Sequence, residues 1–482
     1  MNPAAISRLD LVLAAPEIFM LAAISVVLLV DLFLPERSRW VTFALSLLTL
    51  AGASWITAVT GVGERTVAWH GTYVADPLGA LLKTVAYGAV AVAFLYSYGY
   101  LRTREILKGE YFVLGLFALL GIMVLVSANS LITIYLGVEL LALSLYAMVA
   151  FHRESGIAAE AAIKYFVLGS IASGSLLYGM SIIYGVTGSL ELGAISRTAA
   201  SLGPNQIGLL FGLAFLVVGI AFKFGAVPFH MWVPDVYHGA PTSVTLFLAA
   251  APKLSSFALA FRLLAEGLGP VHGTGWQDMI TIVAVLSIAI GNVVAIAQTN
   301  LKRMLAYSTI SHVGFILLGI LTGTSFGYGA ALYYTVTYVI MAIGGFGMII
   351  LLSRAGFEAD SLDDFKGLNA RSPWFAAVML MLMFSMAGVP PFVGFFAKLS
   401  VIQAILNIGD LWVAIVAVLF SVIGAYYYLR VVKLMYFDEP HDRAALQGSG
   451  SLRLVLSMNG LAVLLLGLFP GVLLALCAQV IP

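Results

Sequence analysis

Apolar residues along this chain occur in long runs that polar segments separate. An α-helix needs about 20 predominantly apolar residues to cross a bilayer. Fourteen runs approach this length, at residues 11–33, 39–61, 77–101, 111–127, 130–151, 158–187, 206–232, 242–266, 277–299, 303–323, 327–353, 373–404, 410–436 and 452–478. The pattern predicts an all-α integral membrane protein with about 14 transmembrane helices.

The amino-acid composition also indicates a protein that is mostly surrounded by lipid. Of 482 residues, 61% are hydrophobic and 10% are charged, and the mean hydropathy is +1.03. Soluble domains carry about a quarter charged residues. The formal net charge of +1 gives no general attraction to nucleic acid. The lipid bilayer is therefore the expected surrounding, and nucleic acid is not an expected partner.

Cysteine content and motifs limit the chemistry of this chain. Its one cysteine, Cys477, cannot by itself hold a thiolate-ligated iron–sulfur cluster or a structural zinc site. The nucleotide motifs GxGxxG and GxxxxGK[ST] and the metal motif HExxH are absent from the sequence. No cofactor or metal site is expected here, and any redox or nucleotide chemistry belongs to partner chains.

Lysines and arginines are divided unequally between the two sets of alternating loops. One set holds fourteen, namely Arg37, Arg39, Arg102, Arg104, Lys108, Arg153, Lys302, Arg303, Arg354, Lys366, Arg371, Lys433, Arg443 and Arg453. The other set holds Arg8, Arg65 and Arg197. Because cytoplasmic loops carry the excess of positive charge, both termini are predicted to be periplasmic.

Two predicted spans contain a proline-rich interruption. GAVPF occupies residues 225–229 of the seventh span, and GVPPF occupies residues 388–392 of the twelfth. Proline removes a backbone donor and clashes with the preceding turn, so each helix is expected to break near the middle of the membrane. Matching broken helices of opposite direction are typical of inverted repeats around an ion path. Two ordinary proline kinks would give the same match.

The pattern divides the chain into four expected parts. Residues 1–110 hold the first three spans, and residues 441–482 hold the last. Residues 111–270 form a five-helix repeat of spans four to eight, and residues 271–440 form the inverted repeat of spans nine to thirteen.

Five ionisable residues lie within apolar spans, namely Glu139, Lys164, Lys223, Lys253 and Lys398. Charged groups in a membrane face the protein interior, pair with one another or titrate. Burial lowers the pKa of a lysine and a nearby carboxylate raises it again. A glutamate–lysine pair that alternately closes and opens would therefore raise and lower the pKa of the lysine, so that the lysine binds and then releases a proton. The spacing leaves open which lysine would pair with Glu139.

Two histidines extend this set. His230 lies seven residues after Lys223, and His312 lies in STISHVG within the tenth span. Imidazole can pass protons in both directions near neutral pH. A lone buried histidine is more often a satisfied core residue, so the sequence leaves both roles open.

Four other charged or titratable residues are expected to have ordinary roles. Asp235 and His238 are predicted in a solvated polar turn after the seventh span. Lys83 and Arg262 lie near helix ends and are predicted to extend their charged groups to the membrane surface.

Three motifs in order carry a family resemblance: GIAFKFGAVPFHMWVPDVYHGAPTSVTLFLAAAPK at 219–253, NLKRMLAYSTISHVG at 300–314 and GVPPFVGFFAK at 388–398. Together they resemble the antiporter-like membrane subunits of bacterial respiratory complex I, the proton-translocating NADH-quinone oxidoreductase, over spans two to fourteen. The form YHGAPTSVTLFLAAAPK is most similar to the N-type subunits. An L-type chain would continue into a long lateral helix, and M-type chains usually differ after the break in the seventh span.

The resemblance implies roles for the ionisable residues. Glu139 would pair with Lys223, and Lys164 would lie near the cytoplasmic point of proton uptake. His230 and Lys253 would connect towards the membrane centre, whereas Lys398 would serve the second half-channel. His312 is a further candidate for the same path.

The resemblance also implies that the chain is a subunit of an enzyme and itself holds no redox centre. It would move protons from cytoplasm to periplasm, coupled to quinone reduction elsewhere. NADH, FMN, iron–sulfur clusters and quinone would be bound by other subunits. The expected partners are M-type and small K-, J- and A-type membrane subunits in the bacterial inner membrane.

Two alternatives share this architecture. A Mrp-type cation/proton antiporter subunit would work without NADH, so copurifying redox subunits would argue against it. A scaffold subunit without pumping activity would tolerate alanine at all of the buried lysines.

Overall fold

The computed structural model describes residues 7–60, 63–202, 207–440, 446 and 448–482. The counted arginine Arg443 and the predicted boundary at residue 441 lie outside these ranges. The first half contains α1 (Arg8–Leu13), α2 (Ala15–Phe33), α3 (Trp40–Thr60), β1 (Thr66–Ala68), β2 (Tyr73–Ala75), α4 (Pro77–Thr103), α5 (Glu110–Val126), α6 (Leu131–Val149), α7 (Gly156–Thr187), α8 (Leu192–Leu202), α9 (Ile207–Phe224), α10 (Trp232–Gly239) and α11 (Thr242–Ala260). The second half contains α12 (Trp276–Ile296), α13 (Leu301–Leu321), α14 (Ser325–Leu352), α15 (Leu368–Arg371), α16 (Pro373–Ala387), α17 (Val393–Asn407), α18 (Leu411–Phe437), α19 (Gly450–Leu468) and α20 (Pro470–Gln479).

Within the described ranges, 12 helices are long and apolar enough to cross a membrane. They coincide with twelve of the fourteen predicted runs. The run 111–127 forms the shorter helix α5, and the run 373–404 forms the pair α16 and α17. The predicted all-α membrane fold is confirmed.

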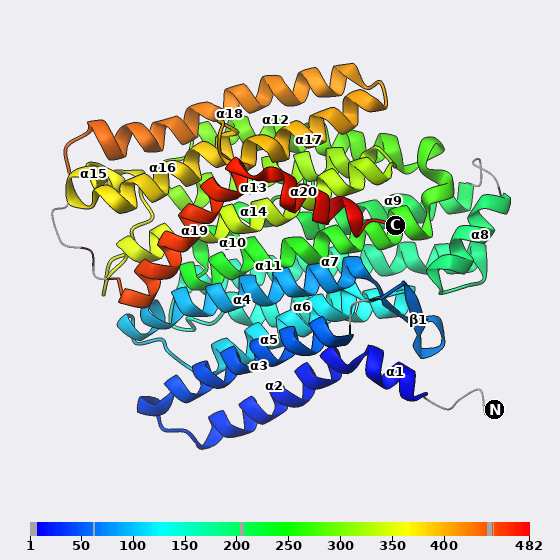
Figure 1. Ribbon diagram of the computed structural model, residues 1–482, viewed down its shortest axis with the longest axis horizontal. Coiled ribbons are helices and arrows are strands. Elements are labelled where there is room, and N and C mark those ends of the chain that lie inside the picture. Colours follow the sequence, from blue (N-terminus) through cyan, green and yellow to red (C-terminus); the bar gives the residue numbers. More distant parts are fainter. Residues whose placement is uncertain (1–6, 61–62, 203–206, 441–445, 447) are drawn as a thin grey trace.

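Three helices form the centre of the bundle. The most apolar window of α11 is 100% buried, and those of α13 and α14 are each 94% buried. In Figure 1 these helices lie between α2 and α3 at one edge and α18 at the other. In the outer helices α2 and α18, only 28% and 33% of the most apolar window is buried, as expected for surfaces that face lipid.

The two ends of the bundle differ in character. In Figure 1, α1 and the end of α20 lie towards the same end of the molecule, together with the hairpin of β1 and β2. The connections from α2 to α3 and from α4 to α5 lie at the opposite end. These two connections hold four of the fourteen basic residues counted above, at positions 37, 39, 104 and 108, and the last turn of α4 adds Arg102.

Both predicted helix breaks are present. Helix α9 ends at Phe224 and α10 begins at Trp232, whereas α16 ends at Ala387 and α17 begins at Val393. A glycine with positive φ follows the end of each first half, Gly225 at 76° and Gly388 at 88°. Glycine adopts this left-handed conformation without the Cβ clash that opposes it in other residues. The prolines then prevent the helix from resuming at once.

The prediction that Lys83 and Arg262 extend to the membrane surface was wrong. The Lys83 ammonium is buried between α2 and α4 and lies 2.5 Å from the Glu17 carboxylate. The Arg262 guanidinium is 1% exposed and lies 2.7 Å from both Asp76 and Glu266. Each cation has a buried carboxylate partner that is distant in sequence, which removes the need to reach water.

Asp76 shows the effect of this pairing. Burial alone would raise the pKa of its carboxyl group, but the Arg262 guanidinium and the Gly79 backbone N–H outweigh it, so the pKa lies below its usual value. The Asp76 side chain also caps the first turn of α4. The pair therefore joins the beginning of α4 to the helical segment Phe261–Gly267, which directly follows α11.

The sequence predicted Asp235 and His238 in a solvated turn, and this prediction was wrong. Both belong to helix α10. Asp235 accepts hydrogen bonds from Lys164 and Arg303 at 2.9 Å each. A carboxylate between two cations holds α10 against α7 and α13, so this residue has a structural contact that its sequence position did not indicate.

Candidate functional site

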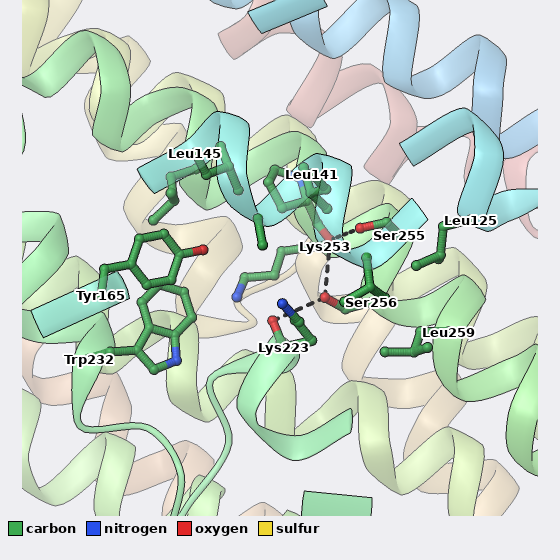
Figure 2. A pocket seen from close by; sticks show the side chains of 14 residues that line it. Leu125, Leu141, Leu145, Tyr165, Lys223, Trp232, Lys253, Ser255, Ser256 and Leu259 are labelled. Carbon is green, nitrogen blue, oxygen red and sulfur yellow. Dashed lines mark hydrogen bonds between the residues drawn. The ribbon is translucent and has the colours of Figure 1, made fainter. Parts of the chain in front are cut away.

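A small cavity lies where the break between α9 and α10 meets α11. Figure 2 shows Lys223 and Lys253 converging on it, with Tyr165 and Trp232 on one side and Ser255 and Ser256 on the other. Its volume is about 30 Å³. Since a water molecule needs roughly 10 to 15 Å³ of such space, there is room for about two.

Lys253 is held by the broken end of α9. Its side chain is on α11, is 1% exposed, and donates from Nζ to the carbonyl oxygen of Phe224 at 2.7 Å. The ammonium also lies 5.9 Å from the centre of the Trp232 ring. The last carbonyls of a helix lack partners within the helix and carry partial negative charge. The break thus provides an acceptor for a cation in an apolar interior.

Lys223 lies in the last turn of α9, directly before the break, and lines the same cavity. Its backbone carbonyl accepts a hydrogen bond from the Ser256 hydroxyl at 3.1 Å. Glu139 lies on α6 next to Val138, which lines the cavity. Oε1 of Glu139 is buried and has no hydrogen-bond partner.

Glu139 and Lys223 therefore lie on two helices that both line the cavity, and the predicted pair is not closed. No ion pair joins the two side chains within the part of the chain that the structure describes. An unpartnered carboxylate oxygen beside a cavity that can hold water is an arrangement in which a water molecule or a side-chain movement could complete the contact.

Lys164 differs from the other lysines. Its side chain is 44% exposed and its Nζ lies 2.7 Å from Glu160 and 2.9 Å from Asp235. The expectation that it belongs to a series of buried lysines was wrong. Its position at the rim, next to Asp235 of the broken segment, agrees with a place at the outer end of a path.

Lys398 repeats the arrangement of Lys253 at the second break. Its Nζ donates to the carbonyl oxygen of Ala387, the last residue of α16, at 2.8 Å, and to the Ser421 hydroxyl at 2.8 Å. The ammonium lies 5.3 Å from the centre of the Phe315 ring. Each interrupted helix thus ends on a carbonyl that accepts a hydrogen bond from a buried lysine.

His312 lies between the two breaks, on the buried helix α13. Its Nδ1 is 2.8 Å from the Tyr334 hydroxyl, and its Nε2 is 3.1 Å from the Tyr428 hydroxyl. The Tyr334 ring stacks on Phe315, the ring that Lys398 approaches. The histidine is therefore part of a connected polar group and is not an isolated core residue.

His230 lies in the segment that separates α9 from α10. It is partly buried, and its Nδ1 has no hydrogen-bond partner. It is not among the side chains that line the cavity around Lys223 and Lys253. The structure therefore places it within the break but outside the lining of the lysine cavity.

A group of buried hydroxyls, most of them on α13, α14 and α18, was not predicted. Thr309 and Tyr338 share a hydrogen bond of 2.7 Å, and Ser308 and Tyr428 share one of 2.5 Å. The hydroxyl of Tyr237, on α10, is buried without a partner. Tyrosine is common in apolar cores, so composition gave no signal. The one sequence feature that could have indicated these groups is the occurrence of three polar residues, Ser308, Thr309 and His312, close together in one apolar span.

A second, larger cavity lies beside the end of α10. Its volume is about 420 Å³, and its lining includes His152, His238, Lys302, Glu358 and Asp360. Lys302 is buried and donates to the Ala240 carbonyl at 2.7 Å. Glu358 contacts Arg104 and the hydroxyl of Thr242, at the start of α11. Polar residues and room for many water molecules make this a solvent-accessible chamber at one end of α11.

Among the described residues, no group of three or more histidine, cysteine, aspartate or glutamate side chains is arranged to hold a metal ion. The chemistry that the site offers is that of lysine, carboxylate, imidazole and hydroxyl groups, which donate and accept protons.

The fold and these groups together define a class, the antiporter-like membrane subunits with broken helices. Residues 128–424 match the model of the NADH:quinone oxidoreductase/Mrp antiporter transmembrane family. The chain is 59% identical over 473 residues to NADH-quinone oxidoreductase subunit N of Thioalkalivibrio sulfidiphilus, with 98% of each chain covered. It is 58% identical to subunit N of Thiobacillus denitrificans, with 97% of each covered.

Solved structures agree with this result. A chain of respiratory complex I from Thermus thermophilus is 30% identical and superposes with a TM-score of 0.81, covering 96% of this chain and 99% of that one. A chain of the Mrp complex from Dietzia, at 22% identity and a TM-score of 0.85, covers 98% of this chain and 97% of its own and shows the shared fold. The chain belongs to the NADH:quinone oxidoreductase/Mrp antiporter family and, within it, to the N subunits of NADH-quinone oxidoreductase.

Proposed function

We propose that this chain moves protons from cytoplasm to periplasm as a membrane-arm subunit of NADH-quinone oxidoreductase in the bacterial inner membrane. The observation that carries the proposal is the hydrogen bond from a buried lysine to the last carbonyl of each interrupted helix, Lys253 to Phe224 and Lys398 to Ala387. Two equivalent proton-binding groups at two breaks are what a path in two halves requires.

The first half of the path would begin at Lys164. A half-exposed lysine paired with Asp235 can exchange protons with water, and Asp235 belongs to the same broken segment as the cavity residue Trp232. From there the proton would reach Lys223 and Lys253. Closure of the pair between Glu139 and Lys223 would favour the charged lysine, and its opening would release the proton to Lys253.

The second half would lead from Lys253 to Lys398. The buried hydroxyl and imidazole groups of Tyr237, Thr309, Tyr338, His312 and Tyr428 would connect the two lysines. Hydroxyl groups relay protons through rotation and through bridging water. His230, with a free buried nitrogen, would act beside the first break. The two halves would be inverted repeats, residues 111–270 and 271–440, each with one broken helix.

Redox chemistry would take place elsewhere in the complex. NADH, FMN, iron–sulfur clusters and quinone would be bound by other subunits, and M-type and small membrane subunits would be the neighbours of this one. Quinone reduction in another subunit would act on this chain by moving a nearby charge. Such a movement would change the electrostatic interaction between Glu139 and Lys223.

Lys223→Ala tests the proposal. In inverted membrane vesicles that oxidise NADH, the variant should give less proton uptake and lower coupled turnover, because the group that Glu139 acts on is gone. Lys433→Ala, a change at an exposed lysine of α18, is the matched control. Proton uptake in the Lys223 variant equal to that of the control would remove Lys223 from the path.

A further inference from the structure

A large charged cavity lies at the end of the bundle away from α1 and α20. It has a volume of about 800 Å³ and is formed by the connection between α2 and α3 and by the segment between α4 and α5. Its charged lining residues are Glu36, Arg37, Arg39, Arg102, Glu105 and Lys108. This volume is within the range of small-molecule binding pockets, about 300 to 1,000 Å³.

The cavity holds an excess of unneutralised positive charge. Arg39 is already neutralised by an ion pair, because its Nη1 lies 2.6 Å from the Asp31 carboxylate. Arg37, Arg102 and Lys108 are exposed, and none of them forms an ion pair with a residue that the structure describes. Three uncommitted cations thus surround a cavity with two exposed carboxylates, so the cavity attracts an anion.

Apolar surface continues directly from this cavity. Trp40, which lines it, is 58% exposed, and Phe33, at the end of α2, is 86% exposed. Leu29 and Leu32 continue the exposed apolar surface along α2. Aromatic residues at the ends of membrane helices lie at the level of the lipid headgroups. The cavity is therefore placed at headgroup depth, with room for acyl chains along α2.

We propose that this cavity binds the headgroup of an anionic phospholipid. Arg37, Arg102 and Lys108 would hold the phosphate, and the acyl chains would lie against α2 and Trp40. Basic pockets at the ends of membrane helices recognise such headgroups. The apolar surface that adjoins the cavity favours a lipid over a free phosphate, which would use only the charged part.

The test uses the whole complex, purified in mild detergent and delipidated, then incubated with micelles that contain phosphatidylglycerol or phosphatidylcholine. Native mass spectrometry counts the lipids retained. The unmodified complex should retain at least one phosphatidylglycerol more than the double variant Arg102→Gln/Lys108→Gln. Removal of two cations should weaken retention by about 10- to 30-fold. Phosphatidylcholine should show no such difference.

The matched control is Arg153→Gln/Lys433→Gln, which removes one arginine and one lysine from exposed positions outside the cavity. It should retain phosphatidylglycerol as the unmodified complex does. If the double variant fails to assemble, the single change Lys108→Gln gives the same comparison. Equal retention by variant and control would overturn the proposal. Binding of millimolar inorganic phosphate by the delipidated complex without retention of phosphatidylglycerol would also overturn it, because the site would then bind only a free anion.

Discussion

At the scale of single residues, the site depends on cations that the fold supplies with different partners. Lys83 and Arg262 have buried carboxylates, whereas Lys253 and Lys398 have backbone carbonyls, with a serine hydroxyl in addition for Lys398. A carboxylate partner fixes the charge of a lysine. A carbonyl partner leaves the lysine able to lose its proton without leaving a second charge behind. This difference separates the buried structural cations from Lys253 and Lys398, whereas the proposed entry residue Lys164 is half-exposed and keeps carboxylate partners.

Arg262→Met should destabilise the protein. The change leaves Asp76 buried without its cation, and loss of one member of a buried ion pair costs about 3 to 5 kcal/mol. A lower temperature of unfolding in detergent, measured by intrinsic fluorescence, would show it. Arg197→Met, on the partly exposed helix α8, is the control and should leave the unfolding temperature nearly unchanged. An unchanged unfolding temperature in the Arg262 variant would show that the pair does not stabilise the fold.

The pair should also depend on pH in a defined direction. The pKa of Asp76 is lowered in the folded protein, so its contribution is fully present above the ordinary carboxyl pKa, near 3.8. It is lost as pH falls through the lower folded pKa. The pair should therefore remain intact throughout the neutral range.

Sequence alone indicated the proposed carriers better than their partners. An ionisable residue within an apolar run is visible in the sequence, and Glu139, Lys223, Lys253 and Lys398 were found in this way. Partners were not visible, because the Phe224 carbonyl has no side-chain signal and lies 29 residues from Lys253. The burial of Lys164 was predicted wrongly for the same reason, since Asp235 seemed to lie in a loop.

At the scale of elements, the two interrupted helices are the devices that make the site. GAVPF and GVPPF predicted both breaks, because glycine and proline act on the backbone locally. What lies against each break depends on the packing of helices far apart in sequence. Lys253 reaches the first break from α11, whereas Lys398 reaches the second from α17, the other half of the same broken helix. A five-residue motif could not indicate this difference.

Gly388→Ala should impair proton movement through the second half. Gly388 has a φ of 88°, and a Cβ there would lie 2.9 Å from Cδ of Lys398. Gly409→Ala is a close control, since Gly409 has a φ of 86° and a Cβ there would meet nothing within 4 Å. Both variants carry a backbone cost of about 1 kcal/mol, but only the first displaces the lysine. Vesicles should show reduced proton uptake for Gly388→Ala alone; equal uptake would mean that the position of Lys398 at the break is unimportant.

At the scale of the whole molecule, the two ends of the helix bundle carry different loops and different numbers of basic residues. The connections from α2 to α3 and from α4 to α5 lie at one end, and α1 and the end of α20 lie at the other. The hydropathy of each run was enough to predict the membrane fold. The buried centre of α11, α13 and α14 was not predictable, because a run that faces protein and a run that faces lipid are equally apolar.

The termini should be periplasmic. In a Cys477→Ser background, Ser7→Cys should react with a membrane-impermeant maleimide added to spheroplasts, because Ser7 is exposed beside α1. Lys433→Cys, near the other end of the bundle, should react only after the membrane is opened. The reverse pattern would invert the proposed direction of proton movement.

The ratio of protons moved to electrons transferred depends on this chain only if its lysines carry protons. It can be measured in vesicles containing the triple variant Lys223→Ala/Lys253→Ala/Lys398→Ala, with NADH oxidation by an artificial acceptor used to confirm that the redox subunits are assembled. We expect the ratio of protons to electrons to fall below that of the unmodified complex. An unchanged ratio at normal assembly would contradict proton translocation by this chain and would show it to be a scaffold.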